Sequence, residues 1–179
     1  MIDYNEPYLI QNINKFEDER GIFYQSYNKN LFNKNFIVDN HSISKKNVVK
    51  GLHYQWDKPL DKLVRVSRGS ILDIIVDIRP NSKHFTKAYY YTLSDDNLNQ
   101  LWVPKGFAHG FCVLSEEAHI QYKFTEEYNK DGENGINIFD EILDIKLPIP
   151  KKDVIMSNKD ANLMSLLEYK NKPKFTDLL

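Results

Sequence analysis

Residues 101–111, LWVPKGFAHGF, decide how this sequence is expected to fold. An apolar run over 101–103 leads into Pro104-Lys105-Gly106, and a Pro-x-Gly tripeptide of this kind predicts a tight turn. A second apolar run over 110–114 follows at once, so the stretch predicts two β-strands joined by that turn. The turn delivers one histidine, His109, to the start of the second strand.

The sequence on either side of this stretch repeats the same rhythm of short strands and turns. Alternating or β-branched runs predict strands at 62–66, 71–78, 88–93 and 118–125. Turn-forming residues separate them at 67–70, 79–82 and 94–97. Helix is expected only as one turn at 29–33 and as a C-terminal helix over 162–169, capped by Ser157 or Asp160. The pattern therefore predicts an all-β sandwich or barrel rather than a βαβ fold.

Length and composition predict one globular domain over residues 1–179. The chain has 179 residues, of which 41% are apolar, enough to close a hydrophobic core. A barrel core is expected over 46–127, followed by a loop-rich segment at 128–179 that contains the short helix. The formal net charge is −1, which gives no indication of binding to nucleic acid or to an anionic membrane surface.

The remaining compositional features favour a cytoplasmic protein. Cys112 is the only cysteine, so no internal disulfide can form, and its place in the apolar run FCVL suggests a buried filler. No secretory signal is visible at 1–7. The most apolar run, 71–78, is interrupted by Asp73 and Asp77, which argues against a transmembrane span.

The Pro-x-Gly-x-x-His pattern at 104–109 is one half of the cupin pattern, so a metal site has to be considered. Metal-binding cupins supply two further histidines and a carboxylate from the earlier half of the barrel, whereas this chain offers only His53 there. Lys62 occupies the position after the following loop, and a charged lysine repels a divalent cation. His53 and His109 alone leave an ion short of protein ligands. No metal is therefore expected.

Without a metal, the same residues suit proton abstraction from a carbon beside a ketone. Histidine is the side chain best suited to act as the base near neutral pH, and a lysine can hold the oxyanion of the enolate. A tyrosine hydroxyl can return the proton, and a carboxylate on the far ring nitrogen can fix the tautomer of the histidine. His53, Lys62, Tyr122 and Asp160 could fill these four roles, although spacing alone does not select them.

Structural roles compete with these chemical ones. Most histidines in proteins are structural or lie at the surface, and this is the interpretation for His41, His84 and His119. His109 could simply brace the pocket, and Asp160 could cap a helix.

A series of motifs in register resembles the dTDP-4-dehydrorhamnose 3,5-epimerase family, a metal-free group with the cupin-type jelly-roll barrel. The motifs are FEDERGIF at 16–23, DNHS at 39–42, VKGLHYQ at 49–55, KLVRVSRG at 62–69, VDIR at 76–79, LWVPKGFAHGF at 101–111, the tyrosine pair Tyr122 and Tyr128, and SNKD at 157–160. The resemblance implies a catalytic set of His53 as base, Tyr122 as acid, Asp160 as partner of the base, and Lys62. It implies no cofactor.

The resemblance also implies how substrate and partner are bound. The substrate-binding residues would be Arg20, Phe23, Gln25, Asn40, Lys50, Gln55, His109 and Tyr128. Family members are homodimers whose N-terminal strands cross to the partner, so residues 1–45 are expected to be exchanged and Arg20 to serve the neighbouring site.

Three departures from the family pattern concern the nucleotide. Lys50 replaces an arginine that binds the diphosphate, which keeps the charge and loses the bidentate fork. Val38 and Gln25 replace a glutamine and a glutamate near the thymine, and a valine leaves a polar edge of that base unpaired. These changes favour a GDP-linked hexose or heptose, with the dTDP-linked sugar as the next candidate.

The expected function is an epimerase that inverts C3, C5 or both in a nucleotide-linked 4-keto-6-deoxy sugar through an enolate, for bacterial capsule or O-antigen synthesis. A nucleotide-sugar 3,4-ketoisomerase and a non-catalytic sugar-binding cupin remain as alternatives. Tyr122 favours epimerisation, because a ketoisomerase can return the proton on the face from which it came.

Overall fold

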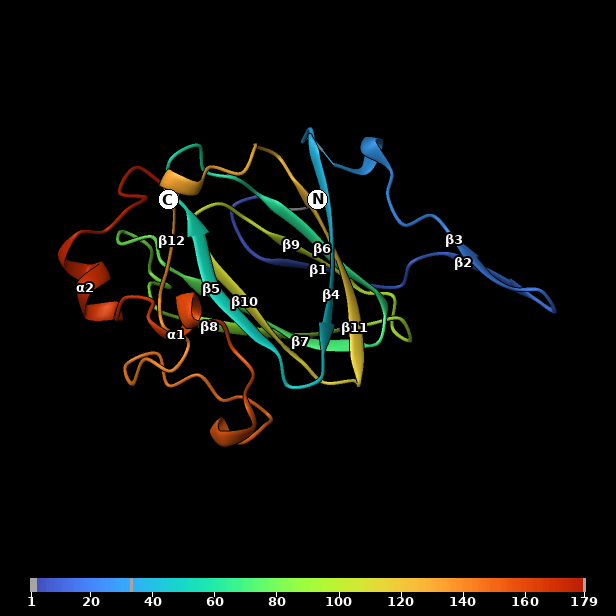
Figure 1. Ribbon diagram of the computed structural model, residues 1–179. Coiled ribbons are helices and arrows are strands. Elements are labelled where there is room, and N and C mark those ends of the chain that lie inside the picture. Colours follow the sequence, from blue (N-terminus) through green and yellow to red (C-terminus); the bar gives the residue numbers. More distant parts are fainter. Residues whose placement is uncertain (1–2, 33, 179) are drawn as a thin grey trace.

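Two five-stranded antiparallel sheets face each other in a computed structural model that describes residues 3–32 and 34–178 (Figure 1). The first sheet has the order β1 (Tyr8–Ile10), β9 (Gln100–Val103), β6 (Lys62–Arg68), β11 (Glu117–Phe124) and β4 (Val38–Lys45). The second has the order β12 (Glu133–Gly135), β5 (Val49–Gln55), β10 (Phe107–Val113), β7 (Ser70–Asp77) and β8 (Ala88–Ser94). The predicted all-β jelly roll of the cupin type is confirmed.

The central core lies between the two sheets, where alternate residues of each strand point inward. Its buried members are Val64, Val66, Ile71, Ile75, Leu93, Leu101, Val103, Phe107, Phe111, Val113, Ala118 and Ile120. In β7 the intervening residues Ile74 and Val76 are also fully buried, because the C-terminal part of the chain covers the outer face of that sheet. Burial on both faces explains why 71–78 is apolar almost throughout.

Each sheet has its own cover on the outer side. Ile136, Ile138, Leu166, Tyr169 and Phe175 pack over the second sheet. Over the first sheet, Phe32 packs with Leu63 and Trp102. Leu63 therefore faces away from the central core and still has an apolar environment. Cys112 is buried without a disulfide, in agreement with its interpretation as a filler.

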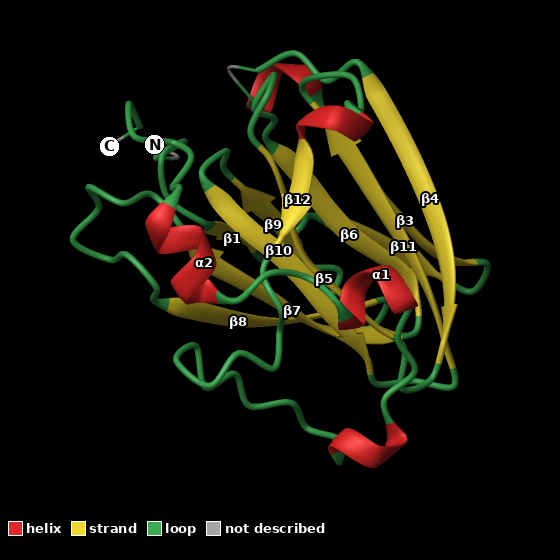
Figure 2. Cartoon of the chain, turned by 60° about the vertical axis from the view of Figure 1, so that its left-hand side comes forward, coloured by secondary structure: helices red, strands yellow, loops and turns green. Residues whose placement is uncertain are grey.

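The helices are short and lie outside the two sheets (Figure 2). The predicted turn at 29–33 is the 3-10 helix η1 (Lys29–Leu31), and Asn33 lies outside the described residues. The single helix predicted over 162–169 is wrong: α1 (Asn158–Ala161) begins after Ser157, and α2 (Leu166–Asn171) begins after Ser165. A capping box between Ser165 and Glu168 starts the second helix, so the chain between the two leaves the helical conformation.

The remaining elements are two 3-10 helices, η2 (Lys130–Gly132) and η3 (Lys151–Asp153), and a hairpin of β2 (Lys15–Asp18) and β3 (Gly21–Tyr24). Among the described residues the hairpin pairs only with itself, and Figure 1 shows it reaching away from the barrel. Within the described part of the chain, no helix is long and apolar enough to cross a membrane.

The approach of β5 to β10 depends on Gly51. This residue has φ +98°, and a Cβ there would lie 2.6 Å from the carbonyl oxygen of His109. Only glycine accepts both conditions without strain. The close approach, with a register shift in β10 just after His109, sets His109 opposite His53 in the sheet.

Candidate active site

A cavity of about 210 Å³ opens between the two sheets and brings the predicted chemistry together. Its lining contains three of the four predicted catalytic residues, His53, Lys62 and Tyr122. The other lining residues are Asn40, Lys50, His109, Gly110, Phe111, Phe124 and Glu133. The second sheet contributes His53, from β5, and the first sheet contributes Lys62, from β6, and Tyr122, from β11.

Asp160 lies behind His53 and is only 4% exposed. Its Oδ1 is 2.7 Å from His53 Nε2, and its Oδ2 accepts a hydrogen bond from the Gly51 backbone N–H at 3.2 Å. Burial raises the pKa of Asp160, but the hydrogen bonds from His53 and Gly51 outweigh it and lower this pKa, so the carboxylate is charged. A charged carboxylate at Nε2 holds the proton of neutral His53 on that nitrogen and leaves the lone pair on Nδ1.

Asp160 also takes part in the start of α1, where its backbone N–H donates to the Ser157 hydroxyl. Ser157 is therefore a helix cap, but of α1, whereas the helix expected over 162–169 is replaced by α2 with Ser165 as its cap. The Asp160 carboxylate itself points to His53 and Gly51, so the helix positions the carboxylate.

Lys62 is held by a buried chain of contacts from the second sheet. The Asp73 carboxylate contacts His109 Nε2 with both oxygens at 2.9 Å, and His109 Nδ1 is 3.5 Å from Lys62 Nζ. Burial lowers the pKa of His109. The charge of Asp73 raises this pKa and the charge of Lys62 lowers it, so that the pKa is lowered overall. Neutral His109 donates from Nε2–H to Asp73 and offers Nδ1 to the ammonium group.

The pKa of Lys62 lies close to neutral pH, and the side chain is still positively charged there. Burial lowers the pKa of Lys62 to about 8, and the negative charges of Asp73 and Glu133 oppose this shift. At neutral pH the side chain therefore remains an ammonium group inside a confined cavity, where a positive charge interacts strongly with an oxyanion.

Tyr122 reaches the cavity from the first sheet. Its hydroxyl is 3.2 Å from Ser42 Oγ of the neighbouring strand β4. Burial raises the pKa of Tyr122, with the hydrogen bond to Ser42 acting in the opposite direction, so the phenol keeps its proton at neutral pH. A protonated phenol in this place can act as an acid.

Glu133 and Asp73 belong to the site, and sequence reasoning did not select them. Glu133 lines the cavity, accepts a hydrogen bond from the Tyr128 hydroxyl at 3.0 Å, and pairs with Lys159. Burial raises the pKa of Glu133, but Lys159 and its other partners lower it overall. The predicted residue Tyr128 is thus connected to the cavity through Glu133 while its own side chain lies at the surface.

The structure places the other predicted binding residues in different surroundings. Asn40 and Lys50 line the cavity. The Gln55 side chain lies outside that lining, where its Nε2 donates to the carbonyls of Lys58 and Glu127 and its Oε1 accepts from the Asn129 backbone. These contacts tie together the loops beside the cavity.

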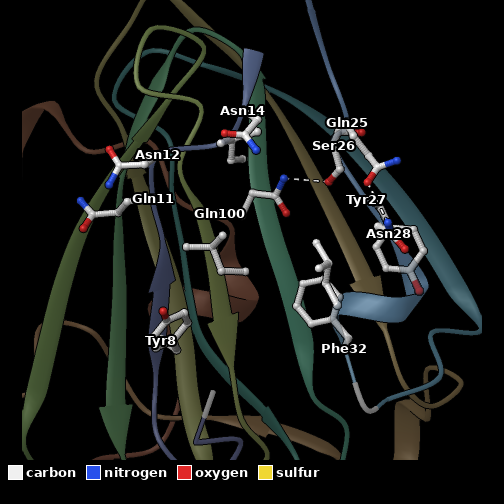
Figure 3. A pocket seen from close by; sticks show the side chains of 13 residues that line it. Tyr8, Gln11, Asn12, Asn14, Gln25, Ser26, Tyr27, Asn28, Phe32 and Gln100 are labelled. Atoms are coloured by element: carbon white, nitrogen blue, oxygen red, sulfur yellow. Dashed lines mark hydrogen bonds between the residues drawn. The ribbon is translucent and has the colours of Figure 1, made fainter. Parts of the chain in front are cut away.

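Arg20, Phe23 and Gln25 do not line the 210 Å³ cavity of their own chain. Arg20 and Phe23 are on the protruding hairpin, where Arg20 pairs with Asp18. Gln25 lines a separate cavity of about 370 Å³ near the base of the hairpin (Figure 3). There its Oε1 accepts from Asn28, while Gln100 donates to the Ser26 carbonyl at 2.7 Å.

The donor set of the cavity does not suit a metal ion. Among residues 3–32 and 34–178, no group of three or more His, Cys, Asp or Glu side chains is placed to hold one. His109 Nδ1 faces Lys62 Nζ at 3.5 Å, and the ammonium group there would repel a divalent cation.

Known proteins resemble this chain over nearly its whole length. The dTDP-4-dehydrorhamnose 3,5-epimerase family model matches residues 5–168. The dTDP-4-dehydrorhamnose 3,5-epimerase of Escherichia coli strain K12 is 46% identical over 170 residues, which cover 91% of each chain.

Two solved structures show the same architecture. The dTDP-4-dehydrorhamnose 3,5-epimerase of Bacillus anthracis with TDP and PPi bound has a TM-score of 0.87 and 38% identity, over 93% of this chain and 97% of that chain. The dTDP-6-deoxy-D-glucose-3,5-epimerase of Legionella pneumophila in complex with dTDP-4-keto-L-rhamnose has a TM-score of 0.85 and 36% identity, over 97% of each chain. By the family match and the shared barrel, this chain belongs to the dTDP-4-dehydrorhamnose 3,5-epimerase family.

Proposed function

We propose that this enzyme inverts C3 and C5 of a dTDP-linked 4-keto-6-deoxy sugar. The observation that carries the proposal is that His53 and Tyr122 line one cavity from opposite sheets. A sugar ring held between them has a base on one face and an acid on the other. Removal of a proton from one face and its return on the other inverts the carbon.

The first step uses the lone pair of His53. Nδ1 takes the proton from the carbon beside the keto group, and the electron pair of that C–H bond moves into the carbonyl to give an enolate. Asp160 supports the imidazolium that forms, since its carboxylate lies 2.7 Å from Nε2. Lys62 stabilises the negative oxygen of the enolate, which develops only as the proton leaves.

The second step uses Tyr122. Its hydroxyl gives a proton to the opposite face of the same carbon, and the carbonyl forms again. C3 and C5 both flank the C4 ketone, so each carbon is acidified by the same carbonyl. One base and one acid can therefore serve the two carbons in succession after the ring turns.

For the nucleotide, we favour thymidine over guanosine. Val38 and Gln25 favour guanine on sequence grounds, but the Bacillus anthracis relative has TDP bound and the Legionella pneumophila relative a dTDP sugar. Neither residue lines the 210 Å³ cavity, so the departures leave the catalytic chamber itself unchanged. Lys50 does line it and keeps a positive charge for a diphosphate.

We further propose that the enzyme acts as a homodimer in the cytoplasm, with the β2–β3 hairpin reaching the partner's site. The hairpin carries Phe16 at 72% exposure and Phe23 at 70%. A two-stranded hairpin with such exposed rings is only marginally stable alone and gains from packing against another surface. Strand β4 carries the cavity residue Asn40 and is an edge strand of the first sheet, so within the described chain its outer side is open to pairing with another strand.

Proton NMR in deuterated water tests the function directly. The enzyme is mixed in turn with dTDP-, GDP-, UDP- and CDP-linked 4-keto-6-deoxy sugars, and the C3 and C5 proton signals are followed. We expect loss of both signals and inversion at both carbons with the dTDP sugar. Exchange with the GDP sugar alone would reject the nucleotide assignment, and no exchange with any of the four would reject the epimerase.

A further inference from the structure

Ser42 is the residue that contacts the hydroxyl of Tyr122. The two side chains come from neighbouring antiparallel strands, with Tyr122 opposite Asn40 and Ile120 opposite Ser42 in the register. Ser42 Oγ and Tyr122 Oη are 3.2 Å apart. Tyr122 lines the cavity and Ser42 does not, so the serine contacts the tyrosine hydroxyl from outside the cavity lining.

The direction of this hydrogen bond decides what Tyr122 can do. If Tyr122 donates to Ser42, the phenolic proton points away from the cavity and cannot reach a carbanion. If Ser42 donates, its proton occupies one lone pair of the Tyr122 oxygen. The phenolic O–H can then point into the cavity, towards the substrate. A serine hydroxyl rotates freely enough to take either role.

The charge left after proton transfer favours Ser42 as the donor. Once Tyr122 has given up its proton, its oxygen is a phenolate in a wall that includes Phe124, and burial penalises that charge. Among the described residues, Ser42 is the one hydrogen-bond partner of the Tyr122 oxygen. A hydrogen bond to a charged oxygen is worth more than one to a neutral oxygen, so this contact strengthens as the reaction proceeds.

We propose that Ser42 is a positioning residue for the proton donor: its hydroxyl donates to Tyr122 Oη, directs the Tyr122 proton into the cavity and stabilises the phenolate that remains. The proposal rests on the epimerase function proposed above. In the step it serves, the Tyr122 O–H bond breaks, its electron pair stays on the oxygen, and a C–H bond forms at the enolate carbon as the C4 carbonyl returns. The Ser42 O–H bond stays intact.

The test separates removal of the proton from its return on the other face. In deuterated water, His53 exchanges the substrate proton with retention, whereas inversion also requires Tyr122. We expect Ser42→Ala to slow inversion about tenfold or more, while deuterium exchange into unreacted substrate stays near the wild-type rate. Ser42→Thr keeps a hydroxyl on the strand and should restore most of the inversion.

Ser44→Ala is the matched control. Ser44 is on the same strand, its side chain is buried, and its hydroxyl has no partner among the described residues. This variant should leave both rates unchanged. Circular dichroism and nucleotide binding show whether Ser42→Ala folds. If it does not, Ser42→Cys takes its place, because a thiol is of similar size and only a weak donor, and its rates of exchange and inversion are compared in the same way.

An unchanged ratio of exchange to inversion in Ser42→Ala overturns the proposal, whether both rates persist or both fall together. Failure of the epimerase function gives a different result, because the wild-type enzyme would then show neither exchange nor inversion.

Discussion

His53 and Tyr122 face one cavity from opposite sheets of the barrel, His53 on β5 and Tyr122 on β11. Each has a polar partner that is not part of the cavity lining, Asp160 at His53 Nε2 and Ser42 at the Tyr122 hydroxyl. Lys62 extends into the same space, where it can meet the carbonyl oxygen of the substrate. In the mechanism proposed above, removal and return of the proton therefore occur at different walls of one cavity.

Loss of the Tyr122 hydroxyl should separate these two ends. Tyr122→Phe removes the acid and leaves the base, so inversion should fall by about 10²–10⁴-fold while retention exchange persists. The measurement is proton NMR in deuterated water with the dTDP sugar. Equal losses of exchange and inversion would show that Tyr122 does not serve the opposite face.

Asp160→Asn should abolish most activity through the tautomer of His53. An amide N–H facing Nε2 favours the neutral form that carries its proton on Nδ1, which removes the lone pair from the cavity. By analogy with triads, we expect a fall in kcat of about 10³-fold or more. Ser157→Ala is the control, because it removes the helix cap at a cost of about 1 kcal/mol and leaves the carboxylate in place. Equal activities of the two variants would contradict this role.

The rate should depend on pH through Lys62. Burial lowers the pKa of Lys62 to about 8, so the free enzyme loses the ammonium group as pH rises through this value. We expect kcat/KM to fall about tenfold per pH unit above pH 8, because the neutral amine cannot hold the enolate charge. Lys62→Arg keeps its charge throughout this range and should lack the alkaline limb. If the alkaline limb persists in Lys62→Arg, it belongs to the titration of another group.

Asp73→Asn should shift the same limb to lower pH. Asp73 raises the pKa of Lys62 against the larger effect of burial, and removal of its charge lets the pKa fall further. In a plot of kcat/KM against pH, the fall on the alkaline side should therefore begin at a lower pH than in the wild-type enzyme. Glu133→Gln should act in the same direction, since Glu133 is the other negative charge that raises this pKa. A limb that stays in place in both variants would show that these charges do not control Lys62.

The strands between 62 and 124 could be predicted from the sequence because each is a local pattern bounded by turn residues. β12 (Glu133–Gly135) could not, since Asp131-Gly132 and Asn134-Gly135 resemble turns. Its glycine is there for another reason: a Cβ at Gly135 would lie 2.4 Å from the Leu52 carbonyl oxygen. Only the tertiary pairing with β5 reveals this, and Glu133 was missed together with its strand.

The contact partners of the site residues also could not be predicted from the sequence. Asp73 interrupts an apolar strand, which is the signature of a buried carboxylate with a specific partner, but the sequence does not name His109 as that partner. His53, Lys62, Tyr122 and Asp160 were selected by family resemblance, since their separation along the chain carries no geometric information. Their meeting depends on the register of two sheets and on the position of α1 against β5.

Mixing two inactive variants should show whether the hairpin acts on the partner's site. In a heterodimer of Arg20→Ala and His53→Asn subunits, one site combines an intact His53 with an intact hairpin if the hairpin crosses over. Random exchange of subunits should then restore about a quarter of the wild-type activity, because half of the dimers are mixed and each has one intact site. His53→Asn mixed with Lys62→Met is the control, since both residues belong to the cavity of one chain and no intact site can form. Activity that stays at the level of the separate variants in the first mixture would place Arg20 in the site of its own subunit, or outside catalysis altogether.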